Sequence, residues 1–121
     1  ARRRILGLDY DLLQETIDVF SPMVYHGRMG RKPEWVQENI NWFSNRLNIG
    51  NSPYPKVWPI VQAHDDPHTI SDKEFETVLR GGLAAKATGV MMFTTSSVAK
   101  SEGKTEVLRK VYTEMKAKTQ K

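Results

Sequence analysis

The chain has 121 residues, of which 39% are hydrophobic and 26% are charged, and its formal net charge is +4. This length suits one domain with a modest core, and the composition is not that of a disordered chain. The absence of cysteine excludes disulfides and thiolate chemistry, and no apolar run approaches the length of a membrane span.

The excess positive charge lies mainly near the two ends of the sequence. The residues concerned are Arg2, Arg3, Arg4, Lys110, Lys116, Lys118 and Lys121. Charges in such places are typically solvated, so we expect no nucleic-acid partner. The chain does not open on a signal peptide, and the residues leave the cellular compartment open.

The first half of the chain predicts a short helix followed by a strand. Asp9 or Asp11 is suited to cap the helix. Residues 17–25, IDVFSPMVY, predict a buried strand in which Pro22 indicates a point where the ladder ends or bulges. Pro33 then suits a first helical turn, and apolar residues at helical spacing follow at Val36, Ile40, Phe43 and Leu47.

The second half repeats this alternation of strand and helix. Residues 56–63, KVWPIVQA, and 89–94, GVMMFT, predict two more strands. Between them, SDKE at 71–74 is a capping box, in which the Ser71 hydroxyl and the Glu74 carboxylate each accept from the other residue's amide. The buried stripe of that helix is Phe75, Val78, Leu79 and Leu83; after a loop containing serine and glycine, the last helix is marked by Val107, Leu108, Val111, Tyr112 and Met115.

A helix followed by three strand-helix units predicts an α/β fold with parallel strands in a single domain over residues 1–121. Functional groups in such folds lie where strands end. Counting alternate residues from Tyr25 makes Tyr25, Gln62 and Phe93 the last residues of the three strands on one face. The other candidate ligand contacts lie where the first two strands end and their loops begin: His26 after the first strand, and His64 and Asp65 after the second.

Three stretches, DVFSPMVYHG, VWPIVQA and TGVMMFTTSS, together resemble strands six to eight of (β/α)₈ glycoside hydrolases related to the family 18 chitinases. The resemblance is closer to bacterial glycoside-hydrolase-like barrels of unassigned activity. In these barrels strand six often reads Asp-x-x-x-x-Met-x-Tyr, which matches Asp18, Met23 and Tyr25. Strand eight reads Gly-Val-Met-x-aromatic, which matches residues 89–93. The resemblance implies that this chain is the C-terminal half of a TIM barrel acting on or binding carbohydrate.

Two departures limit what the resemblance implies. Chitinases usually carry aspartate where this chain has His26 and tryptophan where it has Phe93, so chitin is not the expected substrate. The family's catalytic acid follows strand four, which has no counterpart here. We therefore expect the isolated chain to be inactive, and to pair with an N-terminal half-barrel or with itself to cover its open sheet.

The stretch HDDPH, residues 64–68, allows several interpretations. His64 and His68 have the spacing of a helical zinc pair, but Pro67 breaks a helix and no third ligand is evident. The adjacent carboxylates Asp65 and Asp66 point to opposite sides of an extended segment and would not flank one bond. We expect a solvated loop in which one side chain touches ligand, with neither metal nor cofactor.

Two other classes of function stay open at this point. One is a non-catalytic carbohydrate-binding module, which keeps the aromatic residues and has no catalytic acid in the whole gene product. The other is an α/β protein-interaction domain of the receiver type. Such receivers need an acidic cluster and a phosphoacceptor aspartate at a strand end, where this chain has Tyr25 and His26.

Overall fold

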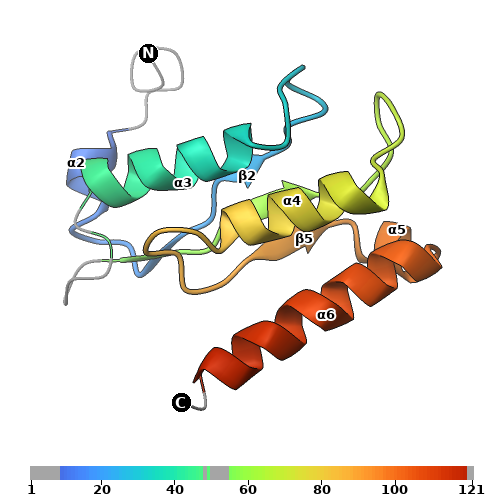
Figure 1. The fold of residues 1–121 in the computed structure, drawn as a ribbon. Coiled ribbons are helices and arrows are strands. Elements are labelled where there is room, and N and C mark those ends of the chain that lie inside the picture. The colour runs from blue at the N-terminus through green and yellow to red at the C-terminus, as the bar shows by residue number, and fades with distance from the viewer. Residues whose placement is uncertain (1–8, 48, 50–54, 120–121) are drawn as a thin grey trace.

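The computed structural model of the protein describes residues 9–47, 49 and 55–119, and their secondary structure alternates between helix and strand (Figure 1). The elements are α2 (Tyr10–Leu13), β1 (Val19–Phe20), β2 (Met23–Val24), α3 (Trp35–Arg46), β3 (Lys56–Val57), β4 (Ile60–Gln62), α4 (Asp72–Gly82), β5 (Met91–Phe93), α5 (Thr95–Ala99) and α6 (Glu102–Thr119). All strand pairs are parallel, with β1 beside β3 and the order β2-β4-β5 in the larger sheet. The chain is an α/β fold, as the sequence predicts.

Prolines divide two of the expected strands. Pro22 separates β1 from β2, and Pro59 separates β3 from β4. Because proline has no N–H, each contributes only its carbonyl: Pro22 accepts from the amide of Ile60 at 2.9 Å, and Pro59 from that of Met91 at 2.8 Å. The predicted break in the ladder at Pro22 is confirmed.

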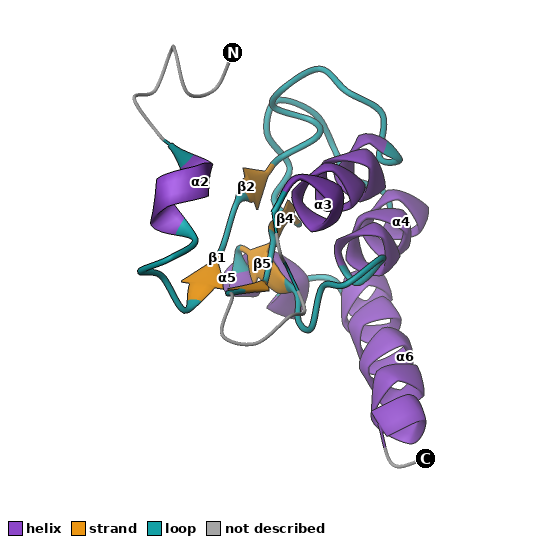
Figure 2. Cartoon of the chain, turned by 90° about the vertical axis from the view of Figure 1, so that its left-hand side faces the viewer, coloured by secondary structure: helices purple, strands orange, loops and turns teal. Residues whose placement is uncertain are grey.

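The helices α3, α4 and α6 lie on one side of the strands (Figure 2). The main apolar core forms between them and the sheet, and includes Val24, Val36, Val61, Ala63, Ile70, Phe75, Val78, Leu79, Val90, Val98 and Val111. Pairing of Met23 with Ile60 and of Ile60 with Met91 places these three side chains in a row on the other side. Met23 is 69% exposed, Met91 37% and Phe93 49%. We call this side, with Met23, Trp58, Ile60, Met91 and Phe93, the open face.

Short α2 covers a second apolar cluster. The Asp9 carboxylate accepts from the Leu12 amide at 3.4 Å, which identifies Asp9 as the cap of α2. The Tyr10 ring then packs edge-on against Phe20 and Phe43. This cluster anchors the beginning of the strands, at the end of the sheet opposite the candidate site.

Two local predictions need correction. Ser71 caps α4, and its hydroxyl accepts a hydrogen bond from the Glu74 amide at 3.1 Å. Among the described residues, however, the Glu74 carboxylate makes no hydrogen bond to the Ser71 amide, so the second half of the predicted capping box is absent. That carboxylate instead contacts His26 at 3.0 Å. The expected loop after the third strand contains helix α5, because the Thr94 hydroxyl accepts from the Ser97 amide at 3.1 Å and starts a helical turn.

Candidate functional site

Three aromatic rings meet where β2, β4 and β5 end. The Tyr25 and Phe93 rings are stacked, with centroids 6.0 Å apart and planes inclined by 26°. The His64 ring packs edge-on against both, with its centroid 5.5 Å from that of Tyr25 and 5.4 Å from that of Phe93. We call these residues the aromatic cluster. Their convergence follows from strand parity, because all three side chains lie on the open face.

Phe93 contributes its backbone as well as its ring to this cluster. Its carbonyl oxygen accepts from the amides of Ala63 at 2.7 Å and His64 at 3.1 Å, and lies 3.0 Å from His64 Nδ1. This carbonyl thus fixes the His64 ring directly beside the end of β5. Burial raises the pKa of the Tyr25 hydroxyl above its ordinary value, against a smaller lowering by Arg28, so the phenol is protonated and able to donate at neutral pH.

Gln62 is the register partner of Phe93 in the sheet, but its side chain is enclosed instead of forming part of the exposed aromatic surface. Its side chain is 0% exposed. The amide nitrogen donates to the carbonyls of His64 at 3.0 Å and Asp66 at 2.8 Å, and the side-chain oxygen accepts from the Arg28 amide at 3.1 Å. Gly27 permits this arrangement, since a Cβ there would lie 3.0 Å from both polar atoms of Gln62. Gln62 therefore joins the loops after β2 and β4, and in this arrangement it has no exposed surface for a ligand.

His26, another expected ligand contact, is 1% exposed. Its Nε2 lies 3.0 Å from the Glu74 carboxylate, and its Nδ1 is enclosed with no hydrogen-bond partner in the part of the chain that the structure describes. The reason is strand parity: the neighbour of Tyr25 points to the opposite face, toward α4. His26 thus ties the loop after β2 to α4, away from the aromatic cluster.

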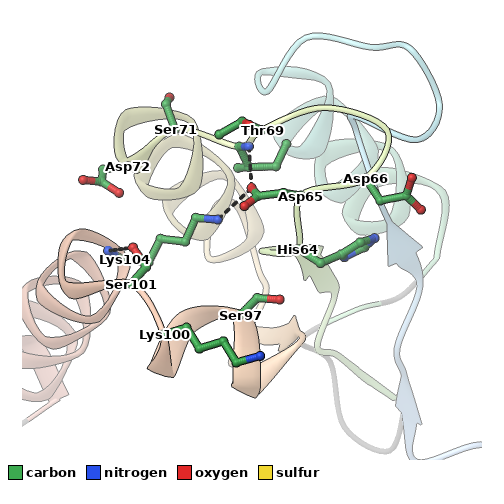
Figure 3. A pocket seen from close by; sticks show the side chains of 11 residues that line it. His64, Asp65, Asp66, Thr69, Ser71, Asp72, Ser97, Lys100, Ser101 and Lys104 are labelled. Atoms are coloured by element: carbon green, nitrogen blue, oxygen red, sulfur yellow. Dashed lines mark hydrogen bonds and ion pairs between the residues drawn. The ribbon is translucent and has the colours of Figure 1, made fainter.

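Asp65 lies on the rim of an open cavity beside the cluster (Figure 3). One carboxylate oxygen accepts from the Ile70 amide at 2.7 Å and from Lys104 Nζ at 3.1 Å. The Ile70 amide, followed by Lys104, holds the pKa of Asp65 below its ordinary value. Asp65 is therefore a carboxylate acceptor at neutral pH, fixed from two directions.

Lys104 is a residue of this site that the sequence did not identify. Its side chain is buried, and its ammonium donates to the Ala63 carbonyl at 2.7 Å as well as to Asp65. In the sequence it is a single lysine near the start of the last helix, and a lysine in such a position is ordinarily expected to be exposed to solvent. Its importance comes from α6 packing against the end of β4.

The side chains of Asp65 and Asp66 point in different directions, as expected for adjacent residues of an extended segment. The Asp66 carboxylate lies 3.6 Å from the Arg28 guanidinium, whereas Asp65 contacts Lys104. The two carboxylates thus have separate partners. In residues 9–47, 49 and 55–119, no group of three histidine, aspartate or glutamate side chains gathers as a potential metal site.

Comparisons with known proteins find no match to this chain. Of the helices that the structure describes, none is both long and apolar enough to cross a bilayer. Searches against family models, curated proteins and solved structures each find no significant match. The functional assignment therefore depends on the chemistry of the site.

Proposed function

We propose that this chain is the C-terminal half of a glycoside-hydrolase-like (β/α)₈ barrel and that its aromatic cluster binds a carbohydrate. The observation that carries the proposal is the meeting of Tyr25, His64 and Phe93 at the carboxyl ends of three parallel strands, on the open face. That is the end of a barrel where ligands bind.

The topology supports a barrel origin. In a barrel, neighbouring strands follow one another in the sequence and the helices form a single outer layer. Here the strand order β2-β4-β5 follows the chain, and α3, α4 and α6 lie on one side (Figure 2). The open face, with Met23 and Met91 exposed, then corresponds to the inside of the barrel, which further strands would cover.

The chemistry of the cluster suits a sugar. Aromatic faces pack against the C–H groups of a sugar ring, and Phe93 is 49% exposed beside the stacked Tyr25. The Tyr25 hydroxyl, which is protonated at neutral pH, adds a hydrogen-bond donor to the cluster. Such a combination of an apolar plane with a few polar groups is typical of small-ligand sites.

Ligand-observed NMR on the 121-residue chain tests this proposal. We expect neutral oligosaccharides to receive saturation from the Tyr25 and Phe93 ring protons, and the Phe93→Ala substitution to remove the effect. Met29→Ala is the matched control, because Met29 is an exposed apolar side chain outside the cluster. Equal binding by wild type and Phe93→Ala, or no binding by wild type, would contradict the proposal.

We expect no hydrolysis by the isolated chain. Glycoside cleavage needs a proton donor near the leaving oxygen, and the half-barrel interpretation puts that acid in the other half. The Ile70 amide and Lys104 lower the pKa of Asp65, so this carboxylate has no proton to donate at neutral pH. Release of nitrophenol from nitrophenyl glycosides above background, abolished by Asp65→Asn or Asp66→Asn, would overturn this expectation.

A further inference from the structure

A polar cavity of about 710 Å³ adjoins the aromatic cluster. It lies between the loop that follows β4, helix α5 and the start of α6 (Figure 3). His64 belongs to both the cluster and the cavity wall, so the two sites adjoin each other at this residue. We call it the polar cavity; its lining includes His64, Asp65, Thr69, Ser71, Ser97, Lys100, Ser101 and Lys104.

The cavity carries both hydrogen-bond donors and hydrogen-bond acceptors, the two kinds of group with which a ligand hydroxyl can bond. Lys104 is buried and holds one oxygen of the Asp65 carboxylate at 3.1 Å. The other oxygen accepts no hydrogen bond from any described residue, and the side chain is half-exposed. Thr69 and Lys100 are exposed on the rim. An ionised carboxylate accepts only, an ammonium donates only, and a hydroxyl does both.

The charges argue against an anionic ligand. Three carboxylates, Asp65, Asp66 and Asp72, line the cavity against two ammonium groups, Lys100 and Lys104. In addition, the Asp72 carboxylate lies against Gly103, in the first turn of α6, where a Cβ would collide with it. The position at which the α6 dipole would attract a bound anion is therefore already covered by a carboxylate of the protein.

We propose that the polar cavity is a second sugar subsite, so that the ligand is a neutral oligosaccharide extending from the aromatic cluster past His64 into the cavity. This inference rests on the proposed function, since the cluster supplies the first subsite. It adds that the preferred ligand has at least two sugar units. Thr69, Asp65 and Lys100 offer the hydroxyl, carboxylate and ammonium contacts to the second.

The test compares a monosaccharide with the corresponding di- and tetrasaccharide, titrated into the 121-residue chain by NMR. We expect the tetrasaccharide to bind at least about tenfold more tightly than the monosaccharide. Thr69→Val and Lys100→Met should each weaken tetrasaccharide binding by about fivefold, the effect of one lost hydrogen bond, and leave monosaccharide binding unchanged. Both residues are exposed, and neither side chain hydrogen-bonds to another residue in the part of the chain that the structure describes.

The outcomes separate the two proposals. Monosaccharide binding that depends on Phe93, with no gain for longer sugars and no effect of the rim substitutions, overturns the second subsite alone. Absence of binding for every sugar overturns both. Inorganic phosphate serves as the anionic probe: saturable shifts of the Lys100 and Ser101 amides by phosphate, at lower concentration than any sugar requires, would contradict the neutral ligand.

Discussion

His64 Nδ1 lies 3.0 Å from the carbonyl oxygen of Phe93, which links the ends of β4 and β5 through a side chain. A carbonyl can only accept, so Nδ1 carries the proton of the neutral ring. Nε2 is then an acceptor, and it is enclosed with no hydrogen-bond partner among the described residues. The Phe93 carbonyl thus determines the hydrogen-bonding character of the ring that joins the two proposed subsites.

His64→Phe should keep the ring packing and remove this bond. Because the Phe93 carbonyl still accepts from two backbone amides, we expect the free energy of unfolding to fall by no more than about 1 kcal/mol. Chemical denaturation of the variant measures this change in the free energy of unfolding. A separate experiment, nitrogen NMR of the wild type, should find the neutral His64 tautomer with its proton on Nδ1. His68→Phe, at an exposed position outside the cluster, is the control. A proton found on Nε2 would refute the assignment.

Gln62→Leu should destabilise the fold strongly. The substitution leaves the Arg28 amide and the carbonyls of His64 and Asp66 without their partner. Each unsatisfied buried group costs about 1–3 kcal/mol, so we expect a loss of at least about 2 kcal/mol in the free energy of unfolding. Gln37→Leu makes the same chemical change on an exposed position of α3. Similar denaturation midpoints for the two variants would contradict the bridging role of Gln62.

Gly82→Ala should also destabilise the fold, although alanine has a higher helix propensity than glycine. A Cβ at Gly82 would lie 2.8 Å from Val90 Cγ2 and 3.3 Å from Val61 Cγ1, where α4 packs on the sheet. Overpacking of this kind costs about 1–3 kcal/mol. Lys73→Ala, exposed on the same helix, should change stability little. A higher melting temperature for Gly82→Ala than for wild type would show that the close approach is not required.

Stability should depend on the ionisation of Asp65. The fold lowers its pKa below the ordinary value of 3.8, first through the Ile70 amide and then through Lys104, so the native state favours the carboxylate. The stabilisation is present above pH 3.8 and is lost as pH falls below it toward the native pKa. Asp65→Asn should therefore flatten the stability profile in that acidic range. Asp66→Asn, at a carboxylate 3.6 Å from the Arg28 guanidinium, is the matched control. An Asp65→Asn profile as steep as that of the wild type would contradict this prediction.

The open face should mediate self-association of the isolated chain. Met23 and Met91 lie in one row of that face and are exposed, and parallel strands with an uncovered apolar face seek a partner. Met23→Lys combined with Met91→Lys should shift sedimentation toward the monomer without loss of helix content. Met29→Lys, at an exposed methionine in the loop after β2, is the control. A wild-type chain that stays monomeric at millimolar concentration would count against the half-barrel.

Several elements could be predicted because their signals are local. The helical spacing of Val36, Ile40 and Phe43 predicted α3, and all three side chains are buried in it. Strand parity placed Tyr25 and Phe93 on one face, and the structure stacks their rings. Local pattern was sufficient here because a side chain's direction along one strand or helix follows from its own backbone.

The sequence by itself determined the alternation of strands and helices and the face on which Met23, Tyr25 and Phe93 lie, but not helix α5 or the division of a second strand at Pro59. Only the tertiary structure decided the partners of the polar side chains. Gln62 bonds to Arg28, 34 residues away, and His26 to Glu74, 48 residues away. Such pairs form because packing buries polar atoms, and a buried polar atom is stabilised by whichever partner the fold brings within reach, at a separation that no local pattern encodes.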